Sequence, residues 1–176
     1  MRWLLVALAV IAALVLVVVA VGYALPVRHV ASVTATIPAP PDSVWAAVAS
    51  PETYQAWHPG VSRVEILQPM DGRVAWRETG KDGAISYVAA ASEPPRRFVS
   101  RITDRDLPFG GSWEWQLAPD GEGTRVTVTE RGEVYNPIFR FVSRFVIGHT
   151  KTLTGYVKAL GRRFGNEATP EVVDAS

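Results

Sequence analysis

Three side chains in this chain carry groups that could perform acid–base chemistry inside a folded domain. Glu130 lies in a predicted strand, residues 124–134, and Glu78 lies in another, residues 73–79. Successive side chains of a strand point to opposite faces, and both glutamates share the parity of apolar neighbours, so we expect both to point inward. A buried carboxyl group has a raised pKa and can act as an acid, a base or a polar anchor for a ligand. His149, on the apolar stripe of a predicted helix, is the third candidate.

A purely structural role would explain the same three residues. Either glutamate could pair with an arginine such as Arg77 or Arg101, or a β-bulge could turn it to solvent. His149 could be a hydrogen-bonded core residue or an exposed one. We therefore assign no catalytic residue from the sequence and keep the two glutamates and the histidine as candidates.

Large aromatic side chains share the inward parity of the two glutamates. Tryptophans on two predicted strands and a tyrosine on a strand between them would form a wall for a flat or apolar ligand. The alternative is that these rings are ordinary core, buried for their large apolar area. The predicted ligand-binding residues are these rings, one carboxylate and one phenylalanine of the helix: Trp76, Tyr87, Trp113, Trp115, Glu130 and Phe145.

Composition and motifs argue against several other functions. The three histidines are far apart in sequence, the chain has no cysteine, and no nucleotide-binding or hydrolase motif is present. We therefore expect no metal and no cofactor. The 18 basic and 17 acidic side chains nearly balance, and no strongly basic patch is visible, so we expect no nucleic-acid partner.

The elements that would position these residues are mostly strands. Alternating apolar residues and turn signals predict seven of them, at 28–37, 61–67, 73–79, 84–91, 98–103, 110–117 and 124–134. Two short helices are predicted at 44–49 and 51–57, and Asn136 and Pro137 open a long helix that runs to about Phe164. One antiparallel sheet with an apolar face must be covered, and the long helix is the element large enough to cover it.

An unbroken apolar run, residues 3–25, precedes the first strand. A membrane span needs roughly 20 such residues, so the run predicts an uncleaved single-pass anchor. A cleaved signal peptide is the alternative, since Gly22-Tyr23-Ala24 is an acceptable cleavage site. Arg2 before the run and Arg28 after it leave the orientation finely balanced, with a slight preference for an extracytoplasmic domain.

Several local signatures, in this order and spacing, resemble the START-like or SRPBCC superfamily, in its polyketide cyclase/dehydrase and lipid-transport branch. They are Ala39-Pro-Pro-Asp-Ser-Val-Trp45, Tyr54-Gln-Ala-Trp-His-Pro-Gly60, Glu93-Pro-Pro-Arg-Arg-Phe98, Phe109-Gly-Gly-Ser-Trp113 and Gly123-Thr-Arg-Val-Thr127. The resemblance implies an α+β helix-grip fold, in which a curved seven-stranded antiparallel sheet wraps a long C-terminal helix around a cavity. The predicted organisation is a transmembrane anchor at 1–26, a START-like domain at 27–165 and a disordered tail at 166–176.

Three functions follow as hypotheses. The first is a membrane-anchored binding or carrier protein, without catalysis, for a hydrophobic small molecule or lipid held in the cavity. The second is a cyclase- or dehydratase-type enzyme that uses acid–base chemistry in the same cavity. The third is a docking domain for another membrane protein, which a filled interior would favour. The sequence leaves open whether any reaction is catalysed.

Overall fold

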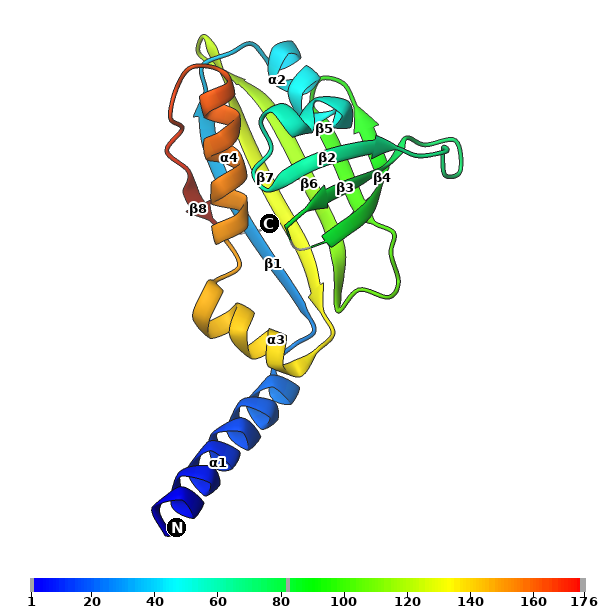
Figure 1. The fold of residues 1–176 in the computed structure, drawn as a ribbon. Coiled ribbons are helices and arrows are strands. Elements are labelled where there is room, and N and C mark those ends of the chain that lie inside the picture. Colours follow the sequence, from blue (N-terminus) through cyan, green and yellow to red (C-terminus); the bar gives the residue numbers. More distant parts are fainter. Residues whose placement is uncertain (1, 82, 175–176) are drawn as a thin grey trace.

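The computed structural model describes residues 2–81 and 83–174 and has an α+β fold. Helix α1, Arg2–Ala24, projects away from the rest of the chain (Figure 1). It is long and apolar enough to cross a membrane, and its span is unburied, although a signal sequence would pass the same test. The domain that follows has its strands and helices in the expected order, which confirms the predicted fold class.

Over the described residues, one antiparallel sheet of eight strands forms the frame of the domain, in the spatial order β2-β3-β4-β5-β6-β7-β1-β8. The strands are β1 Arg28–Ile37, β2 Val61–Ile66, β3 Ala75–Gly80, β4 Gly83–Glu93, β5 Arg97–Ile102, β6 Phe109–Asp120, β7 Gly123–Val134 and β8 Glu171–Val173. Six consecutive strands, β2 to β7, pair with their chain neighbours, and β1 lies between β7 and the edge strand β8. The turn signals between these strands therefore predicted the pairing correctly.

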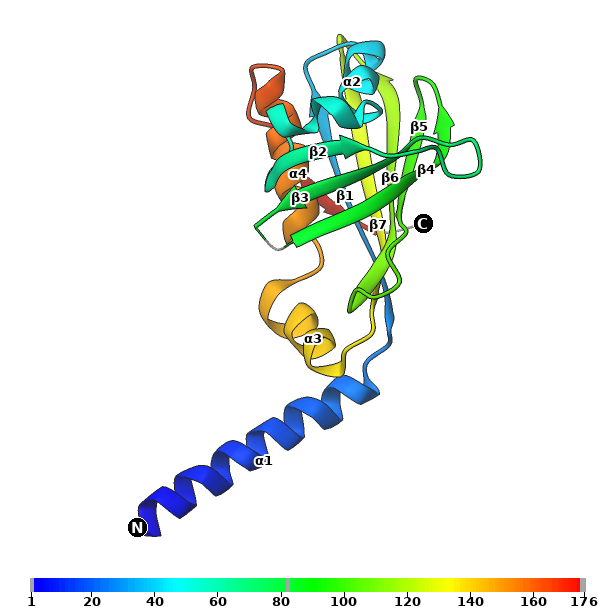
Figure 2. The same cartoon turned by 45° about the vertical axis from the view of Figure 1, so that its right-hand side comes forward.

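Helical segments cover one face of the sheet and its end next to α1 (Figure 1). They are α2 Pro41–Val48, the 3-10 turn η1 Pro51–Ala56, α3 Pro137–Val142, the π-helical turn η2 Ser143–Ile147 and α4 Lys151–Arg163. Helix α4 contacts β1 and β7, and α2 contacts β6 and β7. The two views show α4 along one side of the curved sheet and α2 across its far end (Figures 1 and 2).

The core lies between α4, α2 and the sheet. Its fully buried side chains come from alternate positions of β1 and β7 and from one face of α4, namely Val33, Ile37, Val126, Val128, Leu153, Val157 and Leu160. Residues two apart on a strand and three or four apart on a helix share a face, so both patterns bury the same interior. Parity therefore identifies the inner face of the sheet reliably.

The long helix predicted for residues 137–164 is wrong. Asn136 caps α3 as expected, its Oδ1 accepting hydrogen bonds from the amides of Ile138 and Phe139. The helix is then interrupted at Gly148, whose φ of 79° and ψ of 145° lie outside any helix. A glycine adopts this conformation without the steric cost that a Cβ imposes, so it breaks the helix into two arms.

The count of seven strands is also wrong, and the part of the tail that the structure describes, residues 166–174, is not disordered as predicted; residues 175–176 lie outside the described residues. After Phe164 the chain turns back, Ala168 is buried beside Gly161, and β8 pairs with β1 through Ser32, Val33 and Thr34. Without this pairing β1 would be an open sheet edge, and the short last strand satisfies part of that edge. Polar composition alone did not reveal this pairing.

Candidate ligand-binding interior

The inner face of the sheet brings most of the predicted site residues together. They meet α4 and the η1 turn around a small pocket of about 30 Å³. Its walls are formed by aromatic and polar side chains, namely Tyr54, His58, Glu78, Tyr87, Ser100, Trp113, Trp115 and Tyr156. A space of this size holds one water molecule, so the interior is closely filled with rings in this conformation.

Ring contacts connect the walls of the pocket. Tyr156 of α4 lies 4.0 Å from His58 and 4.7 Å from Trp113, measured between ring centroids. On the opposite side, Trp76 stacks on Tyr87 at 5.5 Å. Tyr156 is therefore the point at which α4 meets both the η1 region and the sheet.

Glu78 is the carboxylate inside the pocket. The indole Nε1–H of Trp76 donates a hydrogen bond of 2.7 Å to its Oε1. Burial favours the neutral form and raises the pKa of Glu78 from 4.5 to about 6, although the hydrogen bond from Trp76 opposes the change. Burial and the charge of Glu78 also raise the pKa of Tyr87 and of Tyr156. The hydroxyl groups of Tyr87 and Tyr156 therefore stay protonated, and they surround the titratable carboxyl group of Glu78.

His58 faces Glu78 across the same pocket. Burial lowers its pKa from 6.5 to about 4, so the ring is neutral at physiological pH. Its Nδ1 is buried and has no hydrogen-bond partner among the described residues. A buried polar atom without a partner is costly, and a ligand that hydrogen-bonds to it would remove that cost.

A second cluster lies toward the end of the domain that joins α1. Glu130 and His29 approach to 3.6 Å between Oε1 and Nε2, and His29 stacks on His149 with ring centroids 3.9 Å apart. Burial, followed by the nearby His29, lowers the pKa of His149. Both histidines line a cleft of about 370 Å³, whose other walls are Leu25, Pro26, Val27, Arg28, Val134, Arg140 and Arg144. Glu130, opposite Trp113 in the β6–β7 register, thus lies between the pocket and the cleft.

The structure therefore divides the predicted site residues into groups. The pocket is lined by Trp113, Trp115, Tyr87 and Glu78. Trp76 contacts the pocket through its hydrogen bond to Glu78. Glu130 and His149 belong to the cleft cluster instead. Among the described residues, no group of three His, Asp or Glu side chains is placed to hold a metal ion.

Phe145 is separated from the other predicted ligand-binding residues. It lies in η2, beyond the break at Gly148, where 59% of its surface is exposed, and it contacts Phe141 at 4.9 Å. Its predicted place in the wall assumed one continuous helix over residues 137–164. That placement was wrong because the helix breaks.

Sequence reasoning missed Tyr54, His58 and Tyr156. The proline and glycine that follow His58 are typical of an exposed turn. However, Tyr54 and His58 are four residues apart, and their rings stack at 5.1 Å between centroids. That spacing puts two side chains on one side of a helical turn, and it was the signal available for finding them.

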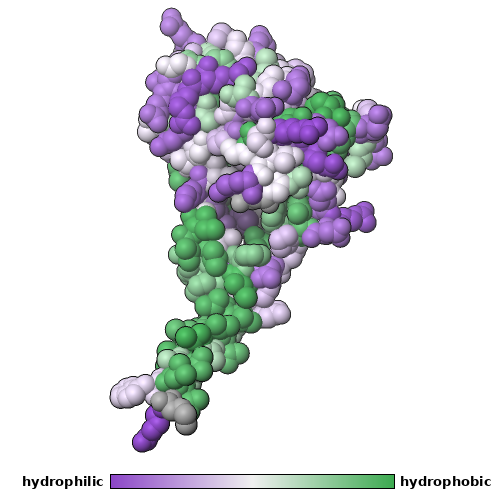
Figure 3. All heavy atoms as spheres, in the orientation of Figure 1, coloured by the Kyte–Doolittle hydropathy of each residue, from purple (hydrophilic) through white to green (hydrophobic). Residues whose placement is uncertain are grey.

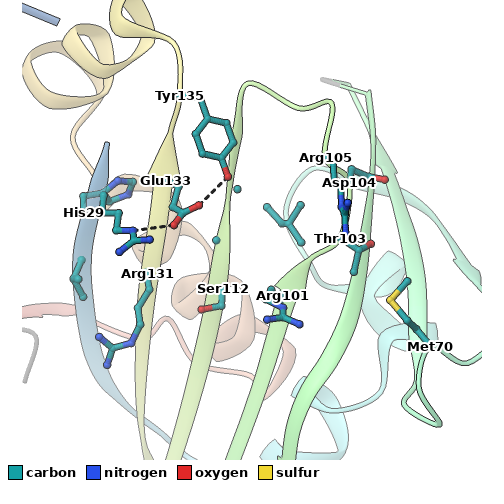
Figure 4. A pocket seen from close by; sticks show the side chains of 15 residues that line it. His29, Met70, Arg101, Thr103, Asp104, Arg105, Ser112, Arg131, Glu133 and Tyr135 are labelled. Atoms are coloured by element: carbon teal, nitrogen blue, oxygen red, sulfur yellow. Dashed lines mark hydrogen bonds and ion pairs between the residues drawn. The ribbon is translucent and has the colours of Figure 1, made fainter. Parts of the chain in front are cut away.

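A larger hollow, of about 970 Å³, lies on the outer face of the sheet. Figure 4 shows its polar lining, in which the hydroxyl of Tyr135 donates a hydrogen bond of 2.8 Å to Glu133. The arginines of this lining are exposed. Its lining includes Arg101, Arg105 and Arg131. An open surface lined by charged side chains does not suit an apolar ligand, so we place the candidate site on the inner face.

A family model for "Polyketide cyclase / dehydrase and lipid transport" proteins matches residues 28–166, which include the whole domain apart from its last strand. The chain therefore belongs to this family, in agreement with the resemblance seen in the sequence. A comparison with curated proteins found no match.

Solved structures with a similar fold include two kinds of protein. A START superfamily protein from Mycobacterium smegmatis is 22% identical, with a TM-score of 0.61 over 78% of this chain and 97% of that one. The ZhuI aromatase/cyclase from Streptomyces sp. R1128 is 18% identical, with a TM-score of 0.62 over 78% and 94%.

A third similar structure is a larger protein. The di-domain aromatase/cyclase StfQ of the steffimycin biosynthetic pathway is 13% identical, with a TM-score of 0.62 over 79% of this chain and 52% of that one. This chain thus spans about half the length of StfQ. These identities show a shared fold, and together with the family they support a cavity that binds a hydrophobic ligand.

Proposed function

We propose that this protein is a membrane-anchored binding or carrier protein for a hydrophobic small molecule or lipid that carries a polar group. The observation that carries the proposal is the aromatic interior with Glu78 and the unpartnered Nδ1 of His58 at its centre. Rings supply apolar contact area, and a few convergent polar groups orient a ligand, which is the usual composition of a small-molecule site.

A filled interior was the expectation for a docking domain, but the buried Nδ1 of His58 without a partner favours a ligand site, which a ligand would occupy by displacing rings. Trp113 and Tyr156 are only half-buried, in contrast to Trp76 and Trp115, so they have more room to move. They lie on the side of Glu130, whose partner His29 lines the cleft next to α1. The cleft includes Leu25 and Pro26, which directly follow the apolar helix. A ligand leaving a bilayer would therefore meet the cleft before the pocket.

A pair of serines provides a matched test. Ser100 on β5 lines the pocket, whereas Ser112 on β6 lies on the outer face opposite Arg101. We expect Ser100→Leu to fill the pocket and weaken binding of an apolar fluorescent probe at least tenfold, while Ser112→Leu leaves binding unchanged. Probe titrations of full-length protein in detergent measure both affinities, and thermal unfolding confirms that each variant is folded. Equal affinities for the two variants would contradict the proposed site.

An acid–base enzyme is the second candidate, because the pKa of Glu78, about 6, is close to physiological pH. Mass spectrometry of ligands that copurify with the wild type and with Glu78→Gln separates the two functions. A carrier retains the same compound in both proteins. An enzyme whose acid or base is Glu78 retains unreacted substrate in the variant.

A further inference from the structure

The segment between the end of the sheet and Gly148 exposes large apolar side chains. Pro137–Val142 and Ser143–Ile147 form α3 and η2, and we call these eleven residues the apolar elbow. Five of its side chains are strongly exposed, namely Ile138 at 43%, Phe139 at 51%, Phe145 at 59%, Val146 at 71% and Ile147 at 51%. Such a concentration of exposed apolar residues marks a surface that is covered by something else.

The elbow is joined to the end of α1. Gly22 is buried, and a Cβ added there would clash with the main-chain carbonyl of Pro137, so the two helices pack backbone to backbone. Arg140 donates a hydrogen bond of 2.8 Å from Nη1 to the carbonyl oxygen of Leu25, and its guanidinium lies 6.0 Å from the ring centroid of Tyr23. The apolar surface of α1 continues onto the elbow (Figure 3). Hence the elbow lies at the level where α1 would leave a bilayer.

The charges around the elbow have one sign. No aspartate or glutamate occurs between Asn136 and Asn166, whereas the exposed Arg144 and Lys151 lie in or beside the elbow. Arg140 is buried against α1 and is not one of these surface cations. Arginines and lysines interspersed with phenylalanine and aliphatic residues are typical of segments that lie in the membrane interface. A protein partner with a polar surface would not require the five exposed apolar residues. A partner with a wholly apolar surface would not tolerate the cations.

We propose that the apolar elbow inserts into the interfacial layer of the same membrane that α1 spans, so that the domain contacts the bilayer at two places. The occupant of this surface is therefore lipid. Two contacts fix the tilt of the domain and turn the cleft lined by His29 and His149 toward the lipid headgroups. The inference requires α1 to be retained, but it is independent of whether the interior binds a ligand.

The absence of cysteine makes a direct test possible. Single-cysteine variants Phe145→Cys and Val146→Cys replace exposed side chains, and Glu122→Cys in the distant β6–β7 turn is the control. Each full-length variant is labelled with an environment-sensitive fluorophore. It is then reconstituted into vesicles of phosphatidylcholine and phosphatidylglycerol. Quenching is measured with brominated lipids and, separately, with aqueous iodide.

We expect brominated lipids to quench the labels at 145 and 146 several-fold more than the label at 122, and iodide to show the reverse order. Iodide quenching at 145 and 146 equal to that at 122 would overturn the proposal. So would labels that neither quencher reaches, because a second protein copy would then cover the elbow. The Ser100→Leu experiment measures ligand binding alone. The proposed ligand site and the proposed membrane contact of the elbow can therefore fail separately.

Discussion

At the scale of single residues, Glu78 and His58 impose opposite pH dependences on stability. Between pH 6.5 and 4 the unfolded chain binds a proton at His58 that the folded state does not, so acidification destabilises the fold by up to about 3 kcal/mol. Between pH 6 and 4.5 the folded state instead holds the extra proton at Glu78, so acidification stabilises it by up to about 2 kcal/mol. In the wild type the effect of His58 is partly offset by Glu78.

The variant Glu78→Gln should therefore lose stability more steeply than the wild type as the pH falls from 6 to 4.5, and it should be more stable at pH 7. Glutamine keeps an oxygen that can accept the hydrogen bond from Trp76. Unfolding in urea across this pH range, followed by tryptophan fluorescence of the detergent-solubilised protein, gives the free energy of unfolding. Glu122→Gln, at an exposed turn, is the control. Parallel profiles for Glu78→Gln and the wild type would show that Glu78 ionises normally.

The residues of the interior were predictable to the extent that strand parity governs them. Glu78, Trp113 and Trp115 follow from period two, because a sheet with one buried face fixes the direction of every side chain. His58 does not follow from such a rule. His58 follows the 3-10 turn η1 and precedes a proline and a glycine. Its burial depends on contact with Tyr156 of α4, which lies about a hundred residues later in the chain.

At the scale of elements, the break at Gly148 decides what the C-terminal helices do. It separates α4, which carries Leu153, Tyr156 and Val157 against the sheet, from an elbow that faces outward. The apolar stripe of this region looked continuous in the sequence, and a glycine inside a helix costs only about 1 kcal/mol. Whether such a glycine remains helical is decided by contacts distant in sequence, here the packing of α3 against α1.

Replacement of each of two glycines in this region by alanine should change the stability of the protein in opposite directions. Gly148→Ala forces a side chain into a conformation that is nearly restricted to glycine and should cost about 1–3 kcal/mol. Gly155 lies inside α4, and an added Cβ meets nothing within 4 Å, so Gly155→Ala should stabilise the protein by up to about 1 kcal/mol. Thermal midpoints of the two variants in the same detergent provide the measurement. Stabilisation by Gly148→Ala would indicate that the helix is continuous in solution.

At the scale of the whole molecule, the question is whether α1 remains part of the protein. Its close packing against Pro137 and the hydrogen bond from Arg140 to Leu25 give α1 a place in the folded structure. A signal peptide is removed from the mature protein, so it has no need of such contacts with the folded domain. The length and hydropathy of α1 fit both readings, and the membrane side of the domain stays a prediction.

We expect the mature chain to begin at Met1 or Arg2 and to resist extraction from membranes by alkaline carbonate. Intact-mass analysis of protein purified from membranes identifies the first residue. A chain that begins at Leu25 would establish cleavage, and it would remove the basis of the double membrane contact. Release of the full-length protein by carbonate would exclude a spanning anchor.

The pairing of β1 with β7 also affects synthesis. Thr34 and Thr127, whose hydroxyls lie 3.1 Å apart, are separated by 93 positions in the chain. Translation adds roughly 5–20 residues per second, so β1 waits roughly 5–20 seconds for its main partner. During that time both backbone edges of β1 are open. The nascent chain is thus exposed to pairing with other chains until β7 emerges, and the remaining edge of β1 stays open until β8 follows.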